Sequence, residues 1–252
     1  MQYLFGGEHP LMTHVKLEIG NDRNNSTGAE ASTKRTAAEK TNILRNAGWQ
    51  IAADAKKINP DVKVSILRWR TPTWVKTNEN IYTWYKEAIL QAYETYGYMV
   101  DYVNPNTNES WIHKSDMEFT KQFKKWVMAE TKETIPDDTE RALYQKIKLI
   151  ITDEAEQFSA EAYEALKTDS EFRNAVSVAG YHYPNKDNTN GGMKVLADEA
   201  HGTHFYFNDR LPKAAIHVGA DMAAVSMHKS GGSLTQSSML LCGPNVNIGY
   251  VD

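Results

Sequence analysis

The chain lacks several features that would point to a particular class of protein. Its 252 residues hold one cysteine, Cys242, which excludes an internal disulfide and a zinc site built on cysteines. No apolar run approaches the ~20 residues that cross a bilayer, so we expect no membrane span. A net charge of −4 gives no reason to expect nucleic acid or an anionic membrane as a partner.

A secretory signal is also missing from the start of the sequence. The first residues, MQYLFGGEHP, do not place a basic stretch ahead of an apolar one. If residue 1 is the true start of the protein, the cytoplasm is therefore the expected location by default.

What the chain does contain is an alternation of short β-branched runs and longer amphipathic segments. This alternation predicts an α/β protein with a mostly parallel sheet. Seven strands separated by helices resemble a (β/α)8 TIM barrel that is incomplete, with its first strand missing. The expected strands are 14–19, 62–69, 98–103, 147–152, 175–180, 195–198 and 222–227. The expected helices are 37–58, 81–96, 116–130, 139–145, 159–167 and 211–218.

Chemically active side chains gather where the predicted strands end. In a TIM barrel these ends share one rim, and the chemistry lies there. The rim would combine carboxylates with aromatic rings and a histidine, which suits sugars, because rings stack on aromatic faces and hydroxyls bond to carboxylates and amides. The segments concerned are 18–22, 69–74, 104–109, 153–154, 182–184 and 198–199.

Most of the chain resembles glycoside hydrolase family 59, the galactocerebrosidase family. The resemblance covers residues ~10–195 and is carried by VKLEIGND…STGAEAS, AGWQIAADAKKINP, LRWRTPTWV, VDYVNPNTNES and VAGYHYP. It implies a retaining β-galactosidase on a (β/α)8 barrel, acting on a β-galactoside or glycolipid-like substrate without a cofactor or metal. It also implies that Glu109 is the acid/base, that Asn108 bonds the sugar 2-hydroxyl, and that Trp69 and Ser26 contact the sugar.

The second carboxylate of such a site is harder to place. Retaining hydrolysis needs two carboxyl groups ~5–5.5 Å apart, one protonated and one ionised. The region expected to hold the nucleophile reads VLADEAHG, and Glu199 ends the strand that would be the seventh. Glu199 is therefore the positional candidate, although its flanks depart from the family. Thr107 also replaces the tryptophan that the family places before Asn-Glu.

The tail, residues ~196–252, resembles the pyridoxal-phosphate-binding major domain of Orn/Lys/Arg decarboxylases. The match is carried by DEAHGTH at 198–204 and SMHK at 226–229. It implies that Asp198 pairs with the pyridine nitrogen and that Lys229 forms the internal aldimine. Ser226 and His228 would hold the phosphate, and His201 would lie near the ring. The family's phosphate loop and C-terminal substrate domain have no counterpart here.

Three interpretations follow from these two resemblances. In the first, a glycosidase-type partial barrel (1–194) has its last units replaced by a decarboxylase-type βαβ segment (195–252) that completes the same sheet. In the second, the chain is a fragment of a pyridoxal-phosphate-dependent decarboxylase with a foreign leader. In the third, it is a non-functional fusion. The first sets the expected function, a glycoside hydrolase whose activity is impaired, and an unclosed sheet edge would favour self-association.

Overall fold

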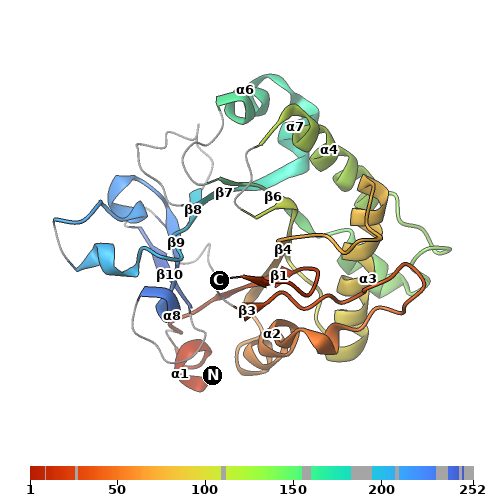
Figure 1. Ribbon diagram of the computed structural model, residues 1–252, viewed down its shortest axis with the longest axis horizontal. Helices are drawn as coiled ribbons and strands as arrows, with labels where there is room; N and C mark the ends of the chain where they lie inside the picture. The colour runs from red at the N-terminus through yellow and green to blue at the C-terminus, as the bar shows by residue number, and fades with distance from the viewer. Residues whose placement is uncertain are drawn as a thin grey trace.

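The computed structural model describes residues 1–8, 10–25, 28–108, 112–154, 160–182, 195–207, 210–230, 238–243 and 246. Within these residues the chain forms an eight-stranded sheet that is curved into a nearly closed barrel (Figure 1). The ladders between neighbouring strands are parallel, except that β10 runs antiparallel to β9. In sheet order the strands are β1 (His14–Ile19), β4 (Lys63–Arg68), β5 (Tyr102–Thr107), β6 (Lys148–Glu154), β7 (Val176–His182), β8 (Val195–Asp198), β9 (Met222–Ser226) and β10 (Ser238–Cys242).

The longer helices lie on the outside of the ring, on the side of β1 and β4 to β7, as Figure 1 shows. The longer ones are α2 (Ala47–Ile58), α3 (Asn78–Tyr96), α4 (Lys114–Met128), α5 (Asp138–Tyr144), α6 (Ala160–Thr168) and α7 (Ser170–Ala175). Short elements complete the fold: α1 (Gln2–Phe5), α8 (Met227–Ser230), the 3-10 turns η1 (Ile43–Arg45), η2 (Thr203–Tyr206) and η3 (Ala215–Val218), and the hairpin strands β2 (Asn24–Asn25) and β3 (Gly28–Ala29). Among the described helices, none is both long and apolar enough to cross a membrane.

The largest hydrophobic cluster lies between the first strands and helices α2, α3 and α4. Trp49, Trp84, Tyr85 and Phe123 are fully buried there. Their rings fill the space between barrel and helices, where each buried large side chain contributes about 1.5–3 kcal/mol. Helix α3 starts where Thr77 accepts a hydrogen bond from Asn80 N, and it ends at Gly97 in the left-handed conformation. The body of the chain therefore has a continuous core of its own.

The seven expected strands are all present, with two differences at the level of elements. The strand expected at 98–103 begins only at Tyr102 and continues through the Asn-Pro-Asn-Thr stretch to Thr107. The turn-like composition of that stretch was misleading, because Asn104 satisfies its polar groups inside the barrel: its Nδ2 donates to Thr152 O and its Oδ1 accepts from Asn106 N. An eighth strand, β10, was not expected and fills the barrel's last place.

Two helix predictions were too long. The segment expected as a helix over 37–58 is helical only from residue 47, after the η1 turn. Residues 37–42 instead form irregular backbone held by side-chain contacts, and the break falls at Asn46, whose side chain caps α2 by accepting from Gly48 N. The helix expected over 211–218 is reduced to η3.

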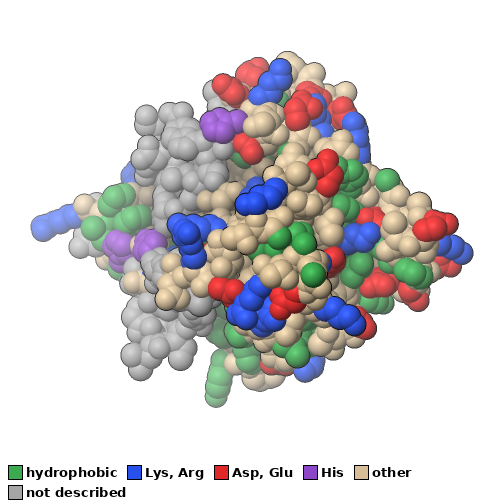
Figure 2. Space-filling model, turned by 45° about the vertical axis from the view of Figure 1, so that its right-hand side comes forward, with side chains coloured by type: hydrophobic (Ala, Val, Ile, Leu, Met, Phe, Trp, Pro, Cys, Tyr) green, Lys and Arg blue, Asp and Glu red, His purple; other side chains and the backbone are tan. Residues whose placement is uncertain are grey.

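The two end strands of the sheet, β1 and β10, approach each other through side chains. Met239 of β10 packs against a cluster formed by Phe5, Met12, Ala55 and Val62, which also contacts Val15 of β1. Self-association through this edge stays a prediction. Figure 2 shows basic and acidic side chains interspersed over the face that it presents, in keeping with the small net charge of −4.

Candidate active site

The loops that follow β1, β4 and β5 meet at the carboxyl end of the barrel. Asn108, directly after β5, is buried, and its backbone N donates to Arg68 O at 2.9 Å. Trp69, directly after β4, is half-buried, and its backbone N donates to Ile19 O at 2.9 Å. These bonds bring Asn108 and Trp69 to one rim. Glu109 and Ser26 lie outside the described residues.

The indole of Trp69 presents an unusual polar atom. Its Nε1 is buried and, among the residues described, has no hydrogen-bond partner. A buried N–H without an acceptor costs about 1–3 kcal/mol. The Trp69 Nε1–H, which lies beside the rim, is therefore suited to donate a hydrogen bond to an oxygen atom of a bound ligand.

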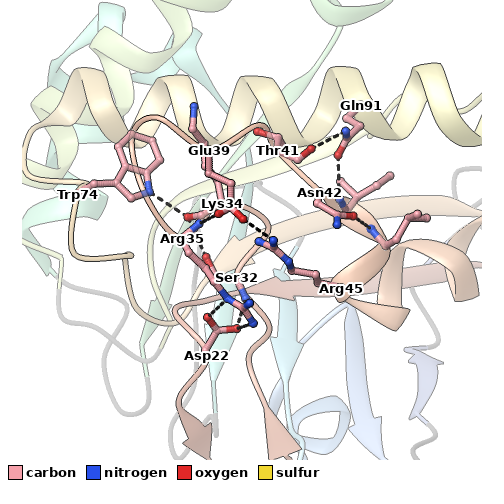
Figure 3. A network of polar contacts seen from close by, with 12 residues as sticks. Asp22, Ser32, Lys34, Arg35, Glu39, Thr41, Asn42, Arg45, Trp74 and Gln91 are labelled. Carbon is pink, nitrogen blue, oxygen red and sulfur yellow. Dashed lines mark hydrogen bonds and ion pairs between the residues drawn. The ribbon is translucent and has the colours of Figure 1, made fainter.

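The long loop after β1 is fixed by a polar network, drawn in Figure 3. Asp22 accepts from Ser32 N and forms an ion pair with Arg35, in which Arg35 Nε lies 2.7 Å from Asp22 Oδ2. Lys34 forms an ion pair with Glu87 of α3 at 2.8 Å, and Trp74 Nε1 donates to Lys34 O at 2.9 Å. The loop after β1 is therefore tied at Trp74 to the loop that follows β4.

A second part of the same network anchors the loop to the helix layer. Glu39 pairs with Arg45, Thr41 donates to Glu87 at 2.7 Å, and Gln91 of α3 bonds to the backbone at Thr41 O and Ile43 N. Irregular backbone that is tied at several points can present side chains in a fixed position. This half of the rim is thus preorganised.

The end of β6 is strained in a way that turns a carboxylate inward. Thr152 is buried and adopts a φ of +65°, which β-branched residues rarely take. The ladder to β7 shifts register between Ile151 and Glu154. Thr152 Oγ1 donates to Gly180 O, and Asn104 Nδ2 donates to Thr152 O at 2.8 Å. These contacts hold the irregular backbone, and the next residue, Asp153, faces the barrel interior.

Inside the barrel, Lys16 of β1 joins two carboxylates. Its Nζ pairs with Asp198 of β8 and lies 3.6 Å from Asp153 Oδ1. The side chains are 27% (Lys16), 17% (Asp198) and 6% (Asp153) exposed. Burial disfavours the charge on Lys16, but Asp153 and Asp198 outweigh it and hold the pKa of Lys16 above its ordinary value. The Lys16 ammonium is therefore held in its charged form between the two carboxylates.

Sequence reasoning did not identify Lys16. The signal is present in HVKLEI, where Val15, Leu17 and Ile19 alternate with polar residues. In a barrel covered by helices the apolar side of a strand faces outward, so the other side must face the interior. A cavity of about 70 Å³ lies there, and it is lined by Lys16, Asp153 and Asp198, by the polar side chains of His14, Ser65 and Asn104, and by apolar residues.

Glu199, the expected nucleophile, lies next to Asp198 but on the outer side of the sheet. Its Oε1 accepts from Ala215 N at 2.8 Å and its Oε2 accepts from Tyr206 OH at 2.9 Å. It is 1% exposed, and burial raises the pKa of its carboxyl above the ordinary value in spite of these two bonds. Both of its oxygens are thus engaged by the η2–η3 segment outside the barrel.

Comparison with known proteins decides the family. The model of glycosyl hydrolase family 59 matches residues 1–206. The chain belongs to this family. It is 25% identical over 222 residues to the galactocerebrosidase of Danio rerio, covering 81% of this chain and 30% of that protein. It is also similar in fold to SrfJ from Salmonella typhimurium, with a TM-score of 0.55, 15% identity, and coverage of 74% of this chain and 47% of that one.

The tail has relatives of a different kind. The chain is 60% identical over 60 residues to the arginine decarboxylase of Bacillus cereus, which is 24% of this chain and 12% of that protein. The family 59 chain thus spans under a third of the galactocerebrosidase and about an eighth of the decarboxylase that it matches. The family 59 match reaches residue 206, so β8, with Asp198 and the adjacent Glu199, lies within it.

The residues of the tail do not fit the cofactor that its resemblance implies. Asp198, which would pair with a pyridine nitrogen, faces the barrel interior and pairs with Lys16. His201 is exposed, and Lys229 and Ser226 are half-buried, near the end of β9. The side chain of His228 lies outside the described residues. The carboxylate that the cofactor would need is thus already paired with an ammonium group, and it is not available to a pyridine nitrogen.

Proposed function

We propose that this family 59 chain is the barrel of a retaining glycosidase that cleaves β-galactosides, with a glycolipid-like galactoside as the natural substrate class. Membership in a glycosyl hydrolase family and the similarity to galactocerebrosidases support this proposal. The observation that carries it is the set of strand ends, where Asn108 and Trp69 follow β5 and β4 and the carboxylates of Asp153 and Asp198, at the ends of β6 and β8, face the barrel interior.

Each of these groups has a use in glycoside cleavage. Glu109 would give a proton to the leaving oxygen, and a carboxylate from β8 would attack the anomeric carbon. Asn108 would bond the 2-hydroxyl, where a hydrogen bond strengthens as the transition state forms. Trp69 would provide a face for the sugar ring and, through Nε1, a donor for a hydroxyl. Ser26 would contact the galactose from the loop after β1.

The test is hydrolysis of an aryl β-galactoside by the parent chain and by Glu109→Gln. We expect the variant to lose about 10²–10⁴-fold in kcat on a substrate with a poor leaving group, the range typical of a lost general acid. Glu164→Gln is the matched control, because the Glu164 side chain is 61% exposed and lies on α6. The anomeric form of the first sugar released, followed by NMR, should be that of the substrate.

Three outcomes would contradict the proposal or a part of it. Equal hydrolysis by Glu109→Gln and the parent would remove Glu109 from the mechanism. No hydrolysis of aryl β-galactosides by the folded parent would favour the non-functional fusion. Faster hydrolysis of the matching aryl β-glucoside would retain a glycosidase but reject the galactoside as its substrate.

A further inference from the structure

Two carboxylates stand side by side at the end of β8, and they point to opposite sides of the sheet. We propose that Asp198, and not Glu199, is the nucleophilic carboxylate of the site, and that Lys16 is the residue that positions it. This inference rests on the proposed function, because a nucleophile has a role only if the chain cleaves glycosides.

The alternation of side chains along β8 decides which carboxylate faces the site. Leu196 and Asp198 line the interior cavity, whereas Ala197 packs outside the barrel with Ala215 of η3. Glu199 continues on the outer side and is held there by Tyr206 and by Ala215 N. To reach the interior, Glu199 would have to break both hydrogen bonds and leave a closely packed place.

The packing around Glu199 leaves it little freedom to turn. A Cβ at Gly202 would lie 2.1 Å from Glu199 Cγ, which means that the chain approaches this side chain as closely as only a glycine permits. Glu199 N also donates to Ala224 O at 2.8 Å. The carboxyl is therefore a fixed part of the packing of the tail on β8 and β9.

The place of β8 in the sheet suits a nucleophile. Glu109 follows β5, and β8 lies three ladders further along the order β5-β6-β7-β8. In an eight-stranded ring this brings the two strand ends to nearly opposite sides of the rim. Retaining hydrolysis needs that arrangement, because the acid and the nucleophile approach the anomeric centre from opposite faces. Asp153 lies on β6, which neighbours β5, so it is on the same side of the ring as the end of β5.

The charge at the site also differs between the two carboxylates. A nucleophile must be ionised, and Asp198 lies in an ion pair with the Lys16 ammonium. Glu199 lies in surroundings that favour the protonated form, since burial raises its pKa. Lys16 Nζ also lies 3.6 Å from Asp153 Oδ1. This second contact fixes the position of the ammonium group relative to Asp198.

The chemical steps balance with water as the only co-reactant. An Asp198 oxygen forms a bond to the anomeric carbon while the bond from that carbon to the aglycone oxygen breaks, and the aglycone oxygen takes a proton from Glu109. A water molecule then gives its proton to Glu109 and attacks the anomeric carbon. The sugar–Asp198 ester bond breaks, and the carboxylate is restored beside Lys16.

The direct experiment traps the covalent intermediate on the full chain. The protein is incubated with a 2-deoxy-2-fluoro-β-galactosyl fluoride, digested at low pH, and the labelled peptide is sequenced by mass spectrometry. We expect the fluorosugar on Asp198. A label on Glu199 or on another carboxylate would overturn this inference and leave the glycosidase proposal intact. Turnover with inversion of the anomeric centre and no label would overturn both this inference and the retaining mechanism of the proposed function.

Variants provide a second measurement. Asp198→Ala should lower kcat at least about a thousandfold, as the loss of a nucleophile does, and formate or azide should restore part of the rate. Asp54→Ala, which removes an exposed carboxylate on α2, is the matched control and should need no rescue. Rescue of Glu199→Ala and not of Asp198→Ala would overturn the assignment.

The positioning role of Lys16 has its own readout. Lys16→Met removes the ion-pair partner that holds Asp198 in place, so it should lower kcat by about 10–100-fold with little change in KM, and Lys16→Arg should restore part of the loss. A kcat of Lys16→Met equal to that of the parent would reject the positioning role. If the parent neither turns over an aryl β-galactoside nor takes the label, the proposed function fails and the nucleophile assignment falls with it.

Discussion

Thr152 and Gly180 form a pair in which one residue is strained and the other makes the strain possible. A Cβ at Gly180 would lie 2.8 Å from Thr152 O and 3.3 Å from Ile150 Cγ2. We therefore expect Gly180→Ala to lower the free energy of unfolding by about 1–3 kcal/mol, as overpacking does. Denaturant unfolding would measure this change. Ser177→Ala, at an exposed position of the same strand, is the control, and an equal effect of both variants would contradict the close-contact argument.

His14 provides a pH-dependent contribution to stability. Burial lowers the pKa of His14 from 6.5 to about 4, helped by Lys16, Lys56 and Lys63 and opposed by Asp101. The unfolded chain thus binds more protons than the folded one between pH 4 and 6.5, so the stability of the parent should fall as the pH is lowered through this window.

The variant His14→Gln tests this expectation. A glutamine can still bond to Ser65 Oγ, which lies 2.8 Å from His14 Nε2, but it does not titrate. Unfolding by denaturant at several pH values between 4 and 6.5 should therefore show a smaller fall in stability for the variant than for the parent. Parallel curves for the two proteins would mean that His14 is protonated at the same pH whether folded or unfolded.

The strand β8 is joined to the far side of the barrel by the Lys16–Asp198 pair, across 182 positions of sequence. Removing one partner leaves a partly buried charge, so Lys16→Met and Asp198→Asn should each destabilise the chain. The double variant should be more stable than the sum of the two losses predicts, with a coupling of about 1–3 kcal/mol. A double-mutant cycle by denaturant unfolding gives this number. Additive losses would show that the pair contributes nothing to holding β8.

Most elements of the barrel could be predicted from the sequence because their periodicity is local. The apolar runs at 62–69 and 195–198 gave strands within a residue of those observed. The Asn-Pro-Asn-Thr stretch of β5 could not be recognised, since the partners that satisfy Asn104 come from β6, far along the chain. The same limit applies to η1, whose preceding loop is fixed by Glu87 and Gln91 of α3 rather than by its own sequence.

The candidate site also has one part that could be predicted from the sequence and one part that could not. Strand ends bring Trp69, Asn108 and Asp153 to the rim, and this could be expected from their positions after predicted strands. The choice between Asp198 and Glu199 could not, because it depends on which side of β8 faces the interior. That side is fixed by Lys16 within the barrel and by Tyr206 and Ala215 outside it. The second carboxylate of the site is thus a property of tertiary packing.

The molecule combines a family 59 barrel with a tail that is similar in sequence to arginine decarboxylases, and the sheet continues across both. A shared sheet requires the tail's side chains to serve the barrel. The segment 195–226 contributes β8 and β9, whose alanines Ala197 and Ala223 pack with Ala215 and Ala220. Because side chains alternate along β8, the same packing places Asp198 in the barrel interior. Completing the barrel and presenting Asp198 to a pyridine nitrogen are therefore competing uses of one carboxylate.

This competition predicts how the protein responds to pyridoxal phosphate. We expect no absorbance band of an internal aldimine that depends on Lys229 when the parent is titrated with pyridoxal phosphate, because Asp198 is paired with Lys16. Borohydride reduction followed by peptide mapping would show whether Lys229 or a surface lysine reacts, and Lys229→Ala is the control. A band that disappears in Lys229→Ala, together with reduction at Lys229, would mean that the tail keeps a cofactor site and that Asp198 is free to leave the barrel interior.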